Sequence, residues 1–533
     1  MSQVAPNALN DAVHWADLTA DKLIRAEDKE VYTLASGITP SGVVHFGNFR
    51  EVMTTELVAR GLKKKGKKVR FIFSWDDYDT FRKVPANLPK QDELAKYLFQ
   101  PIVDTPDPFG EHESYARHHE ASFEAQLKKM GIELEPIYQA KKYKSGAYKE
   151  QIKLTLAKKD VIAAILNKWR SEPLPSSWMP VSVYCEKCNR DKTTATKYDG
   201  NKMLDYVCDA EDCKHTGSID LDTTSRAKLP WRMDWPMRWS VEKVDFEPGG
   251  KDHSSQGGSF TTAKDIVAEV YGWKAPMYLQ YDFVSIKGMG GKMSSSKGNL
   301  VTVNDVLSVY EPEMVRWIFA SYKTNIDFGL SFDLDVIKNY EDFDRMERMA
   351  FGLEAGNEKK VAMAKRVYEL SQIHDIPTEM PFQPGFRHLC NVLQINDLDI
   401  SRARKSYDKD IKNERDERRF KERAERAINW INDHAPDEFK FALNKDVVKM
   451  DINEKETKFL NELNAYLKTE WNNITDDKML HEKMYEMIHA HELEPMQVFT
   501  LLYRKLINLE KGPKLAGFIR TIGIDRVSKL LVP

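Results

Sequence analysis

The feature that most constrains the fold is a strand, turn, helix and strand pattern close to the N-terminus. Residues 31–38 are a short apolar run that enters a turn of Gly, Pro and Ser. Residues 49–62 carry apolar side chains every three to four positions, which predicts an amphipathic helix ending near Gly66, and residues 68–75 form a second apolar strand. This is a βαβ unit. It predicts an α/β fold with a Rossmann-type parallel sheet and a ligand at the carboxyl ends of its strands.

The turn of this unit has the composition of an anion site. A turn between a strand and a helix presents backbone N–H groups and the positive end of the helix dipole. Gly47 allows close approach, and His45 and Asn48 can donate hydrogen bonds to phosphate oxygens. The alternative is a structural histidine packed beside Phe46.

A second stretch, residues 287–299, reads KGMGGKMSSSKGN. Lys292 supplies mobile positive charge, and the hydroxyls of Ser294 and Ser295 can bind phosphate oxygens. Taken alone, the stretch also fits a solvent-exposed Gly/Ser linker. Together with the turn at residues 39–48, it favours two halves of one nucleotide site.

Four of the five cysteines lie within 29 residues, as the pairs Cys185/Cys188 and Cys208/Cys213. Four thiolates in two knuckles predict a tetrahedral structural zinc site in a reducing compartment, with no open catalytic position. The second knuckle is wider than a CxxC pair, so His215 is an alternative ligand. The isolated Cys390 is predicted to be a small buried side chain.

Residues 231–239 place three tryptophans and two arginines around Asp234. This pattern fits a core with an ion pair, or the wall of a pocket for a cationic side chain, which tryptophan faces attract and an acid neutralises. Residues 249–258 form a second Gly-rich loop before a helix, suited to the ribose and adenine side of a nucleotide. Residues 281–286 are predicted to be one strand leading to residues 287–299.

Charged segments elsewhere leave alternatives open. The net charge is −2, so any RNA site must be a local basic patch. Residues 141–144 combine basic and aromatic side chains, which fits an RNA contact or a solvated helix end. The histidines at 112, 118 and 119 fit a metal site, but a polar helix face or an RNA-facing surface is the preferred interpretation. Residues 402–426 hold 11 Lys/Arg against 7 Asp/Glu, which indicates a solvated helix face or an RNA-contacting helix.

The N-terminal residues lack the basic and apolar regions of a secretory leader, and no window holds the roughly 18 apolar residues of a membrane span. We therefore expect a cytoplasmic protein that does not associate with a membrane. Helical patterns dominate from about residue 300 to residue 533.

The two glycine-rich motifs resemble known signatures. TPSGVVHFGN resembles the HIGH signature of class I aminoacyl-tRNA synthetases, and KMSSSKGN resembles their KMSKS signature. Together with SGITPSGVVHFGNFREV, FSWDDYD, WRMDWPMRW, FEPGGKDHSSQGGS and KGMGGKMSSSKGN, they make the chain similar to the class I lysyl-tRNA synthetases. The resemblance covers about residues 30–300 and, more weakly, the helical C-terminal part. Asn48 replaces the second histidine of HIGH and Ser295 the second lysine of KMSKS, so Lys297 and Lys287 are possible helpers of Lys292.

The resemblance implies ATP-dependent activation of L-lysine to lysyl-adenylate and its transfer to tRNA(Lys), with Mg²⁺ entering with ATP and no obligate protein partner. His45, Asn48 and Lys292 are the expected catalytic residues. The expected ATP contacts are Pro40, Ser41, His45, Gly47, Asn48, Gly257, Lys292, Ser294 and Ser295. The expected lysine contacts are Gly37, Thr39, Trp231, Trp235, His253 and Tyr281, with the choice between the two tryptophans left open. The expected zinc ligands are Cys185, Cys188, Cys208 and Cys213.

The expected organisation has five parts. Residues 1–110 hold an N-terminal helix and the first half of the catalytic domain, residues 111–228 an insertion with the zinc knuckles, and residues 229–300 the second half of the catalytic domain. Residues 301–345 form a connecting region that contacts the tRNA stem, and residues 346–533 an α-helical region that binds the anticodon. The competing interpretations are another class I synthetase such as a glutamyl-type enzyme, a small nucleotidyltransferase, or a zinc-ribbon binder of nucleic acid.

Overall fold

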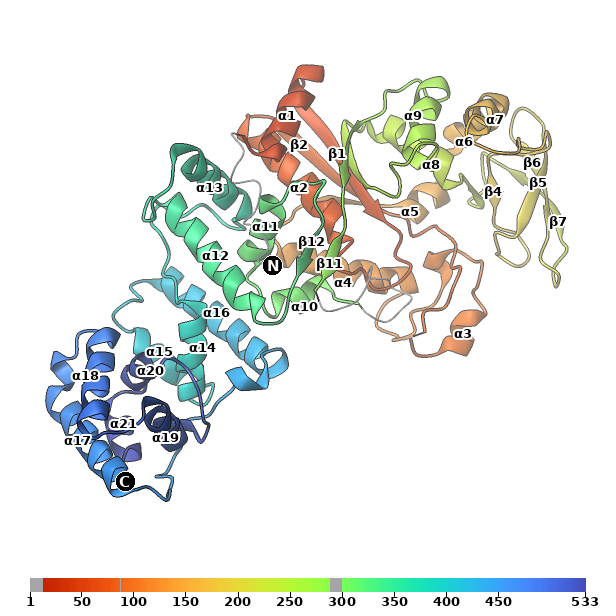
Figure 1. Cartoon of the computed structure of the whole chain (residues 1–533). Coiled ribbons are helices and arrows are strands. Elements are labelled where there is room, and N and C mark those ends of the chain that lie inside the picture. Colours follow the sequence, from red (N-terminus) through yellow and green to blue (C-terminus); the bar gives the residue numbers. More distant parts are fainter. Residues whose placement is uncertain (1–12, 87, 288–299) are drawn as a thin grey trace. The chain divides into compact units, whose positions relative to one another are not determined.

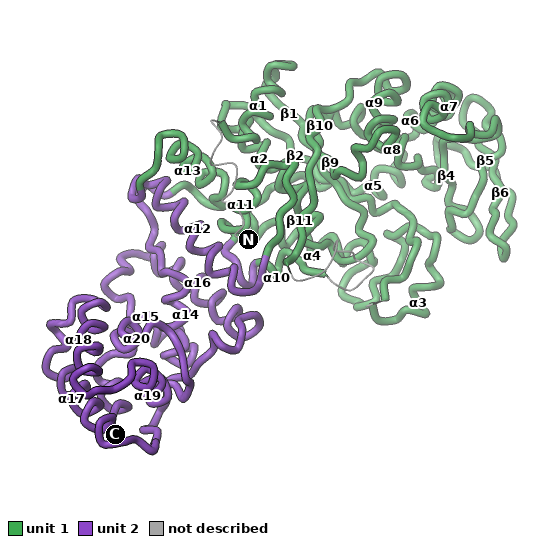
Figure 2. The backbone as a smooth tube through the Cα atoms, in the orientation of Figure 1, with its two compact units in different colours: residues 1–306, 312–330, 355–376 green, residues 307–311, 331–354, 377–533 purple. Residues whose placement is uncertain are grey.

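The computed structural model describes residues 13–86, 88–287 and 300–533. The chain divides into two compact units (Figures 1 and 2). Unit 1 comprises residues 1–306, 312–330 and 355–376, and unit 2 comprises residues 307–311, 331–354 and 377–533. Within the described ranges, no helix combines the length and apolar character that crossing a membrane requires.

Unit 1 is built on a five-stranded parallel sheet with the strand order β10-β9-β1-β2-β3. Counted along the chain this order is 5-4-1-2-3, so the strand order reverses between β1 and β9. In open parallel sheets, ligands bind outside the carboxyl ends of the strands at such a reversal. The strands are β1 (Val31–Ile38), β2 (Lys68–Trp75), β3 (Glu135–Tyr138), β9 (Phe246–Gly250) and β10 (Met277–Tyr281).

The βαβ unit predicted from the sequence is confirmed. β1 and β2 pair in parallel from Val31 opposite Lys68 to Ile38 opposite Trp75, and α2 (Phe49–Lys64) joins them. Helix α2 packs on β1, β2 and β9. The helices α8 (Trp231–Glu242) and α9 (Ser259–Glu269) pack on the side chains of Ala35, Ile72 and Ile137.

One predicted strand is wrong. Residues 281–286 do not form one strand, because β10 ends at Tyr281 inside the main sheet and β11 (Val284–Ile286) pairs instead with β12 (Phe328–Leu330). The break follows from Asp282, whose N–H donates to the carbonyl of Thr324 at 2.8 Å and so turns the chain out of the main sheet.

Unit 1 also contains two small antiparallel sheets and further helices. The zinc-knuckle segment contains a three-stranded antiparallel sheet and a two-stranded one, formed by β5 (Thr193–Tyr198), β6 (Met203–Cys208), β7 (Thr216–Asp220), β4 (Ser182–Val183) and β8 (Ala227–Lys228). The other helices are α1 (Trp15–Ala26), α3 (Gln91–Ala95), α4 (Tyr115–Lys129), α5 (Gln139–Lys144), α6 (Lys149–Ala157), α7 (Lys159–Asn167), α10 (Val303–Leu307), α11 (Pro312–Ser321) and α13 (Glu358–Ser371).

Unit 2 is helical throughout. Its C-terminal helices enclose one apolar core that includes Phe459, Leu480, Leu502 and Ile519. The helices are α12 (Asp335–Ala350), α14 (Phe386–Ile395), α15 (Ile400–Arg404), α16 (Glu414–Asp433), α17 (Glu454–Glu470), α18 (Asp477–Ala490), α19 (Pro495–Ile507), α20 (Leu515–Ile522) and α21 (Ile524–Leu530).

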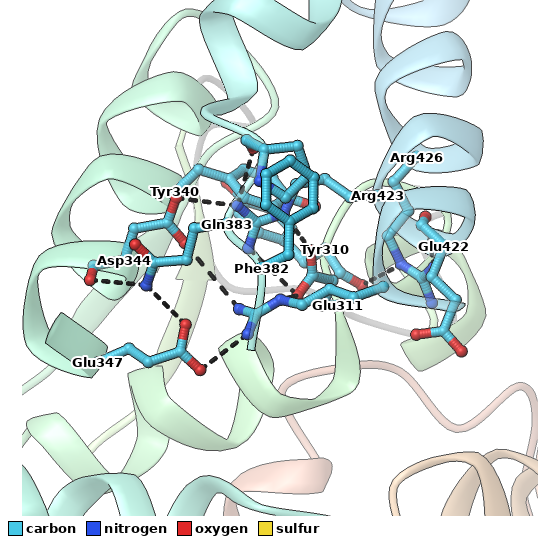
Figure 3. Close-up of polar contacts among 12 residues, drawn as sticks. Tyr310, Glu311, Tyr340, Asp344, Glu347, Phe382, Gln383, Glu422, Arg423 and Arg426 are labelled. Atoms are coloured by element: carbon cyan, nitrogen blue, oxygen red, sulfur yellow. Dashed lines mark hydrogen bonds and ion pairs between the residues drawn. The ribbon is translucent and has the colours of Figure 1, made fainter. Parts of the chain in front are cut away.

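The charged run at residues 402–426 is not uniformly solvated. Arg423 of α16 is 0% exposed, and its guanidinium pairs with Glu311 at 2.5 Å and with Asp344 at 2.9 Å (Figure 3). Arg419 pairs with Glu347 at 2.8 Å in the same cluster. These ion pairs join α16 to α12 and to residues 307–311, so part of the run is a structural core of unit 2.

Candidate active site

Two cavities open at the carboxyl ends of β1, β2 and β9. The smaller, of about 90 Å³, is lined by Gly37, Glu51, Asp76, Glu247 and His253, together with side chains of α8. The larger, of about 790 Å³, is lined by the turn after β1, by residues 79–85 and by residues 228–231. Trp231 lines both cavities, so it lies at their border.

Helix α8 forms the aromatic wall of the small cavity. Trp231, Trp235 and Trp239 recur every four residues and therefore lie on one helix face. The rings of Trp231 and Trp235 stack with centroids 5.1 Å apart and planes 14° apart, and the ring of His253 lies 6.0 Å from that of Trp235. The sequence did not decide between Trp231 and Trp235 as ligand contacts, and both line the cavity.

The floor of the small cavity is acidic. The carboxylate of Glu51 on α2 accepts hydrogen bonds from the N–H of Gly37 at 2.9 Å and from the hydroxyl of Tyr281 at 2.8 Å. Burial raises the pKa of Glu51 from 4.5 to about 8, an effect to which Glu247 adds. Burial likewise raises the pKa of Glu247 to about 7, although Trp239 donates its indole N–H to that carboxylate at 2.5 Å.

Arg238, which lines this cavity, is already neutralised. Arg238 pairs with Asp76 at 2.5 Å and with Asp234, which also accepts the hydroxyl of Tyr143 at 2.6 Å. Asp234 therefore belongs to an ion pair of the kind expected in a packed core, while the tryptophans beside it line the cavity. Among the described residues, no lysine or arginine pairs with Glu51 or Glu247. A ligand with a positive charge would supply the missing partner.

Gly37 is required by close packing between strands. A Cβ atom at this position would lie 2.7 Å from the carbonyl oxygen of Ser74 on β2. The absence of a side chain also leaves room for a ligand over the end of β1. Thr39, two residues further on, lines the larger cavity, where its hydroxyl donates to Asp79 at 2.8 Å.

The larger cavity has the features of an anion site. His45 and Asn48 line it at the N-terminal end of α2, where the helix dipole and the first backbone N–H groups favour negative charge. The side-chain oxygen of Asn48 accepts the N–H of His45 at 3.3 Å, which leaves the amide NH₂ group for a ligand. Ser41 and Lys228 also line this cavity, and Lys228 pairs with Asp79.

The lysine and serine residues of the second motif, Lys292, Ser294 and Ser295, lie outside the described residues. The chain on either side of them is held by backbone hydrogen bonds. The N–H of Lys287 donates to Leu330 at 2.7 Å, and the N–H of Phe46 donates to the carbonyl of Val301 at 2.7 Å. The second bond joins the chain just after the motif to the turn that carries His45.

The four predicted zinc ligands converge. The sulfurs of Cys185, Cys188, Cys208 and Cys213 lie within 4.8 Å of one another, with Cys185 to Cys213 at 3.8 Å and Cys188 to Cys208 at 3.7 Å. Four sulfurs bound tetrahedrally at about 2.3 Å from one ion are about 3.8 Å apart, so the donor set fits zinc. His215 is not a member of this group in the described structure. Cys390 is buried, as predicted.

The zinc knuckles adjoin the larger cavity. Tyr184, next to Cys185, donates its hydroxyl to the carbonyl of Tyr78 at 2.8 Å. Asp191, three residues after Cys188, accepts the hydroxyl of Thr80 at 2.7 Å and pairs with Arg82 at 3.0 Å. Tyr184 and Asp191 both line the cavity, so the knuckles hold part of its wall.

Comparison with known proteins identifies the family. Residues 13–374 match the family model described as tRNA synthetases class I (K). The chain belongs to this family. It is 48% identical over 97% of its length to a lysine--tRNA ligase of Borreliella burgdorferi, 98% of which is covered. It is also 46% identical to a lysine--tRNA ligase of Treponema pallidum (98% of each chain) and 40% identical to one of Pyrococcus horikoshii (97% and 99%).

Among solved structures, a glutamate tRNA ligase from Elizabethkingia meningosepticum aligns over 94% of this chain and 98% of its own length, with a TM-score of 0.42 and 14% identity. The resemblance to class I synthetases drawn from the sequence motifs is confirmed by the family match.

The structure groups most of the residues predicted for a class I synthetase site. Gly37, Trp231, Trp235 and His253 line the small cavity, and Thr39, Ser41, His45 and Asn48 line the larger one. Tyr281 contacts the small cavity indirectly, because its hydroxyl donates a hydrogen bond to the carboxylate of Glu51. Pro40 is buried in the turn, Gly47 lies beside Asn48, and Gly257 has a φ of +74° and packs on Trp169.

Sequence reasoning missed the acidic floor. Glu51 stands in a segment whose periodicity marks only an amphipathic helix, and Glu247 lies in the strand before the second Gly-rich loop. Asp76 was the one residue that pointed to an acidic site, because it directly follows an apolar strand that ends at a sheet edge where ligands bind. Nothing local in the sequence marks Glu51 or Glu247 as facing the same cavity.

Proposed function

We propose that this chain ligates L-lysine to tRNA(Lys) in two steps, of which the first consumes ATP. The observation that carries the proposal is the small cavity at the strand-order reversal, where the buried carboxyl groups of Glu51 and Glu247 lie beneath stacked tryptophans. A lysine side chain supplies the cation that this cavity lacks, and the indole faces of α8 attract its ammonium group. Gly37, Thr39, His253 and the α8 tryptophans then contact the amino acid.

The same cavity disfavours glutamate. A carboxylate side chain needs a cationic anchor, but the guanidinium of Arg238 is occupied by Asp76 and Asp234. Placing a further carboxylate beside Glu51 and Glu247 would add repulsion in a buried site. A glutamyl-type activity is therefore the weaker alternative.

The larger cavity is the proposed ATP site. In this assignment the phosphates of ATP lie over the N-terminal end of α2, where His45, Asn48 and the backbone around Gly47 donate hydrogen bonds. Pro40 and Ser41 shape the turn, Gly257 lies on the nucleoside side, and Lys292, Ser294 and Ser295 contact the pyrophosphate portion. Mg²⁺, when bound with ATP, neutralises phosphate charge.

In the first step an oxygen of the lysine carboxylate attacks the α-phosphorus of ATP. A new P–O bond forms as the bond to the β-phosphate oxygen breaks, giving lysyl-adenylate and pyrophosphate. The protein acts by positioning and by stabilising charge: His45 and Asn48 hold phosphate oxygens, and Lys292 neutralises the leaving pyrophosphate. In the second step the terminal ribose hydroxyl of tRNA attacks the lysyl carbonyl and releases AMP.

Two further assignments belong to this proposal. Cys185, Cys188, Cys208 and Cys213 hold a structural Zn²⁺, whose closed ligand shell supports the wall of the ATP site. The acceptor end of tRNA reaches unit 1, and the helical residues 346–533 bind the anticodon. The five-part division of the chain stays a prediction.

The experiment that tests the activity is ATP–pyrophosphate exchange with purified protein and a panel of amino acids, each with and without tRNA. We expect exchange with lysine and not with glutamate, because only a cation complements the acidic floor. Exchange with glutamate alone would retain the nucleotide site and overturn the assignment of the small cavity. No exchange with any amino acid in the presence of tRNA would overturn the proposed function.

The role of Lys292 is tested by Lys292→Ala. We expect kcat for exchange to fall about 100-fold or more, as for the loss of one group that stabilises transition-state charge, with little change in lysine affinity. Lys274→Ala, which removes a partly exposed lysine that pairs with Glu27, is the control and should leave both quantities unchanged. Equal losses in kcat and in lysine affinity would contradict the assigned role.

A further inference from the structure

A lysine from the segment that carries the cysteine knuckles reaches the wall of the larger cavity. Lys228 forms β8 together with Ala227, and its side chain is 12% exposed. It lines the cavity together with Ser41, His45 and Asn48 of the turn before α2. Neither the sequence motifs nor the proposed ATP contacts include this lysine.

The ammonium group of Lys228 is fixed by one carboxylate. It pairs with Oδ1 of Asp79, whose Oδ2 accepts the hydroxyl of Thr39 at 2.8 Å. Both oxygens of Asp79 are therefore engaged, and the ammonium group is held at a defined position. An ammonium group has three N–H donors, and among the described residues only Asp79 accepts one from Lys228. Two donors remain for a ligand in the cavity.

Lys228 is a cation at neutral pH. Burial acts to lower the pKa of its ammonium group, but the carboxylates of Asp79 and Asp234 outweigh burial and raise the pKa. Burial likewise acts to raise the pKa of Asp79, but Lys228 and the hydroxyl of Thr39 hold it below its usual value. The pair therefore consists of two ions, of which only the lysine can donate hydrogen bonds to an anionic ligand.

The cysteine knuckles hold the backbone that carries Lys228. β8 pairs with β4 in the antiparallel direction, next to the first cysteine pair. Arg226, two residues before Lys228, donates its guanidinium N–H groups to the carbonyl of Cys185 at 3.2 Å and to the side chain of Asn189 at 3.0 Å. The carbonyl of Arg226 accepts the N–H of Tyr184 at 2.9 Å. These contacts fix the position from which the side chain of Lys228 extends.

Lys228 also lies on the side of the larger cavity that adjoins the small one. Thr39, an expected lysine contact, shares the carboxylate of Asp79 with it. Trp231, three residues after Lys228, lines both cavities. In the proposed reaction the lysine carboxylate meets ATP at this border, so the α-phosphate is the phosphate nearest to Lys228.

We propose that Lys228 is a further catalytic residue, whose ammonium group donates a hydrogen bond to a non-bridging oxygen of the α-phosphate. This inference rests on the proposed function. During in-line displacement the equatorial oxygens of the reacting phosphorus carry negative charge, and a cation that is already in place stabilises that charge. Lys228 forms no covalent bond and transfers no proton. Asp79 is a positioning residue that holds the ammonium group.

The competing interpretation is an ion pair that only holds β8 against the loop after β2. The test measures kcat for lysine-dependent ATP–pyrophosphate exchange with tRNA present, together with Tm. We expect Lys228→Met to lower kcat about 100-fold or more, with a smaller change in KM for lysine and for ATP. Lys202→Met, which breaks a pair with Asp220 in the same segment, is the control and should leave kcat unchanged.

A double variant separates catalysis from stability. Asp79→Asn/Lys228→Met removes both charges, so it should regain Tm relative to Lys228→Met, because no carboxylate is left without its partner. Its kcat should stay low. Lys228→Arg, which keeps the charge, should retain more activity than Lys228→Met.

Two results would overturn the proposal in favour of a structural ion pair. One is an unchanged kcat in Lys228→Met, and the other is a kcat that returns together with Tm in the double variant. Absence of exchange in the wild type would be a different result, because it would overturn the proposed function and this inference with it.

Discussion

A carboxyl group deprived of water holds its proton more tightly, and Glu51 is the clearest case in this molecule. Its side chain faces a cavity in which Glu247 and Asp76 are also acidic, and its hydrogen bonds from Gly37 and Tyr281 do not offset burial. Such a group ionises readily only when a cation arrives. In the proposed function, lysine binding is therefore linked to the ionisation of Glu51, whose pKa is displaced from 4.5 to about 8.

The first prediction concerns protons released on lysine binding. Glu51 is mostly protonated in the free protein at pH 7, and the bound ammonium group favours its carboxylate, so binding should release up to one proton. Lysine affinity should therefore rise as the pH increases from 6 to 8, by at most tenfold per pH unit. Calorimetry of lysine binding in buffers of different ionisation enthalpy measures this release, and a buffer-independent binding enthalpy would contradict it.

The second prediction concerns Glu51→Gln. Removing the carboxylate should weaken lysine binding about 10- to 150-fold, the usual range for a hydrogen bond to a charged group. Ionising Glu51 disfavours the folded state as the pH rises from 4.5 through 8, so the variant should fold at least as well as the wild type at pH 7. Glu247→Gln is the matched comparison: a larger loss there would transfer the ammonium contact to Glu247.

Elements determine which residues meet at the site. Helix α8 places a tryptophan every four residues on one face, and the parallel pairing of β1 with β2 brings Gly37 beside Ser74. The zinc knuckles act at the same scale. The four converging cysteines lie close in the sequence to Tyr184 and Asp191, which line the larger cavity.

The third prediction is made for the knuckle element. Cys208→Ser should remove one equivalent of zinc and destabilise β5, β6 and β7, and each kcal/mol lost should lower Tm by about 2–4 °C. ATP should bind more weakly, because Tyr184 and Asp191 lose their support, while lysine binding is retained. Cys390→Ala, which alters a buried cysteine in unit 2, should leave the zinc content unchanged. Unchanged ATP affinity after zinc loss would separate the knuckles from the nucleotide site.

At the scale of the whole molecule, the chain passes between its two units more than once, since residues 307–311 and 331–354 belong to unit 2 and residues 312–330 and 355–376 to unit 1. Unit 2 is held by more than apolar packing. Arg423 and Arg419 of α16 meet Glu311, Asp344 and Glu347 in a buried cluster, which brings three separate segments of the chain together (Figure 3). Each buried charge in such a cluster depends on its partners.

The fourth prediction is Arg423→Met, which leaves Glu311 and Asp344 buried without their main partner. We expect unit 2 to lose about 3–5 kcal/mol, seen in calorimetry as a transition moved to lower temperature, while lysine binding to unit 1 is retained. Arg418→Met on the exposed side of the same helix is the control and should change the stability by about 0.5 kcal/mol or less. Equal shifts for the two variants would show that the cluster adds nothing to stability.

Local patterns in the sequence determined much of this protein. Apolar periodicity placed β1, α2 and β2, and their pairing as a parallel βαβ unit is confirmed, because that information lies within a few dozen residues. The spacing of four cysteines likewise predicted one metal site. Residues 281–286 were wrongly assigned to one strand, since a short apolar run carries no record of which sheet each half joins.

Only the tertiary structure decided which charged groups lose their water. Glu51 from α2 and Glu247 from β9 are far apart in the sequence, and their shifted pKa values arise because packing brings them to one buried cavity. Arg423 lies in a run that reads as solvated, yet it is buried because α12 and residues 307–311 fold against it. Desolvation depends on neighbours contributed by distant segments, so no local pattern in the sequence records it.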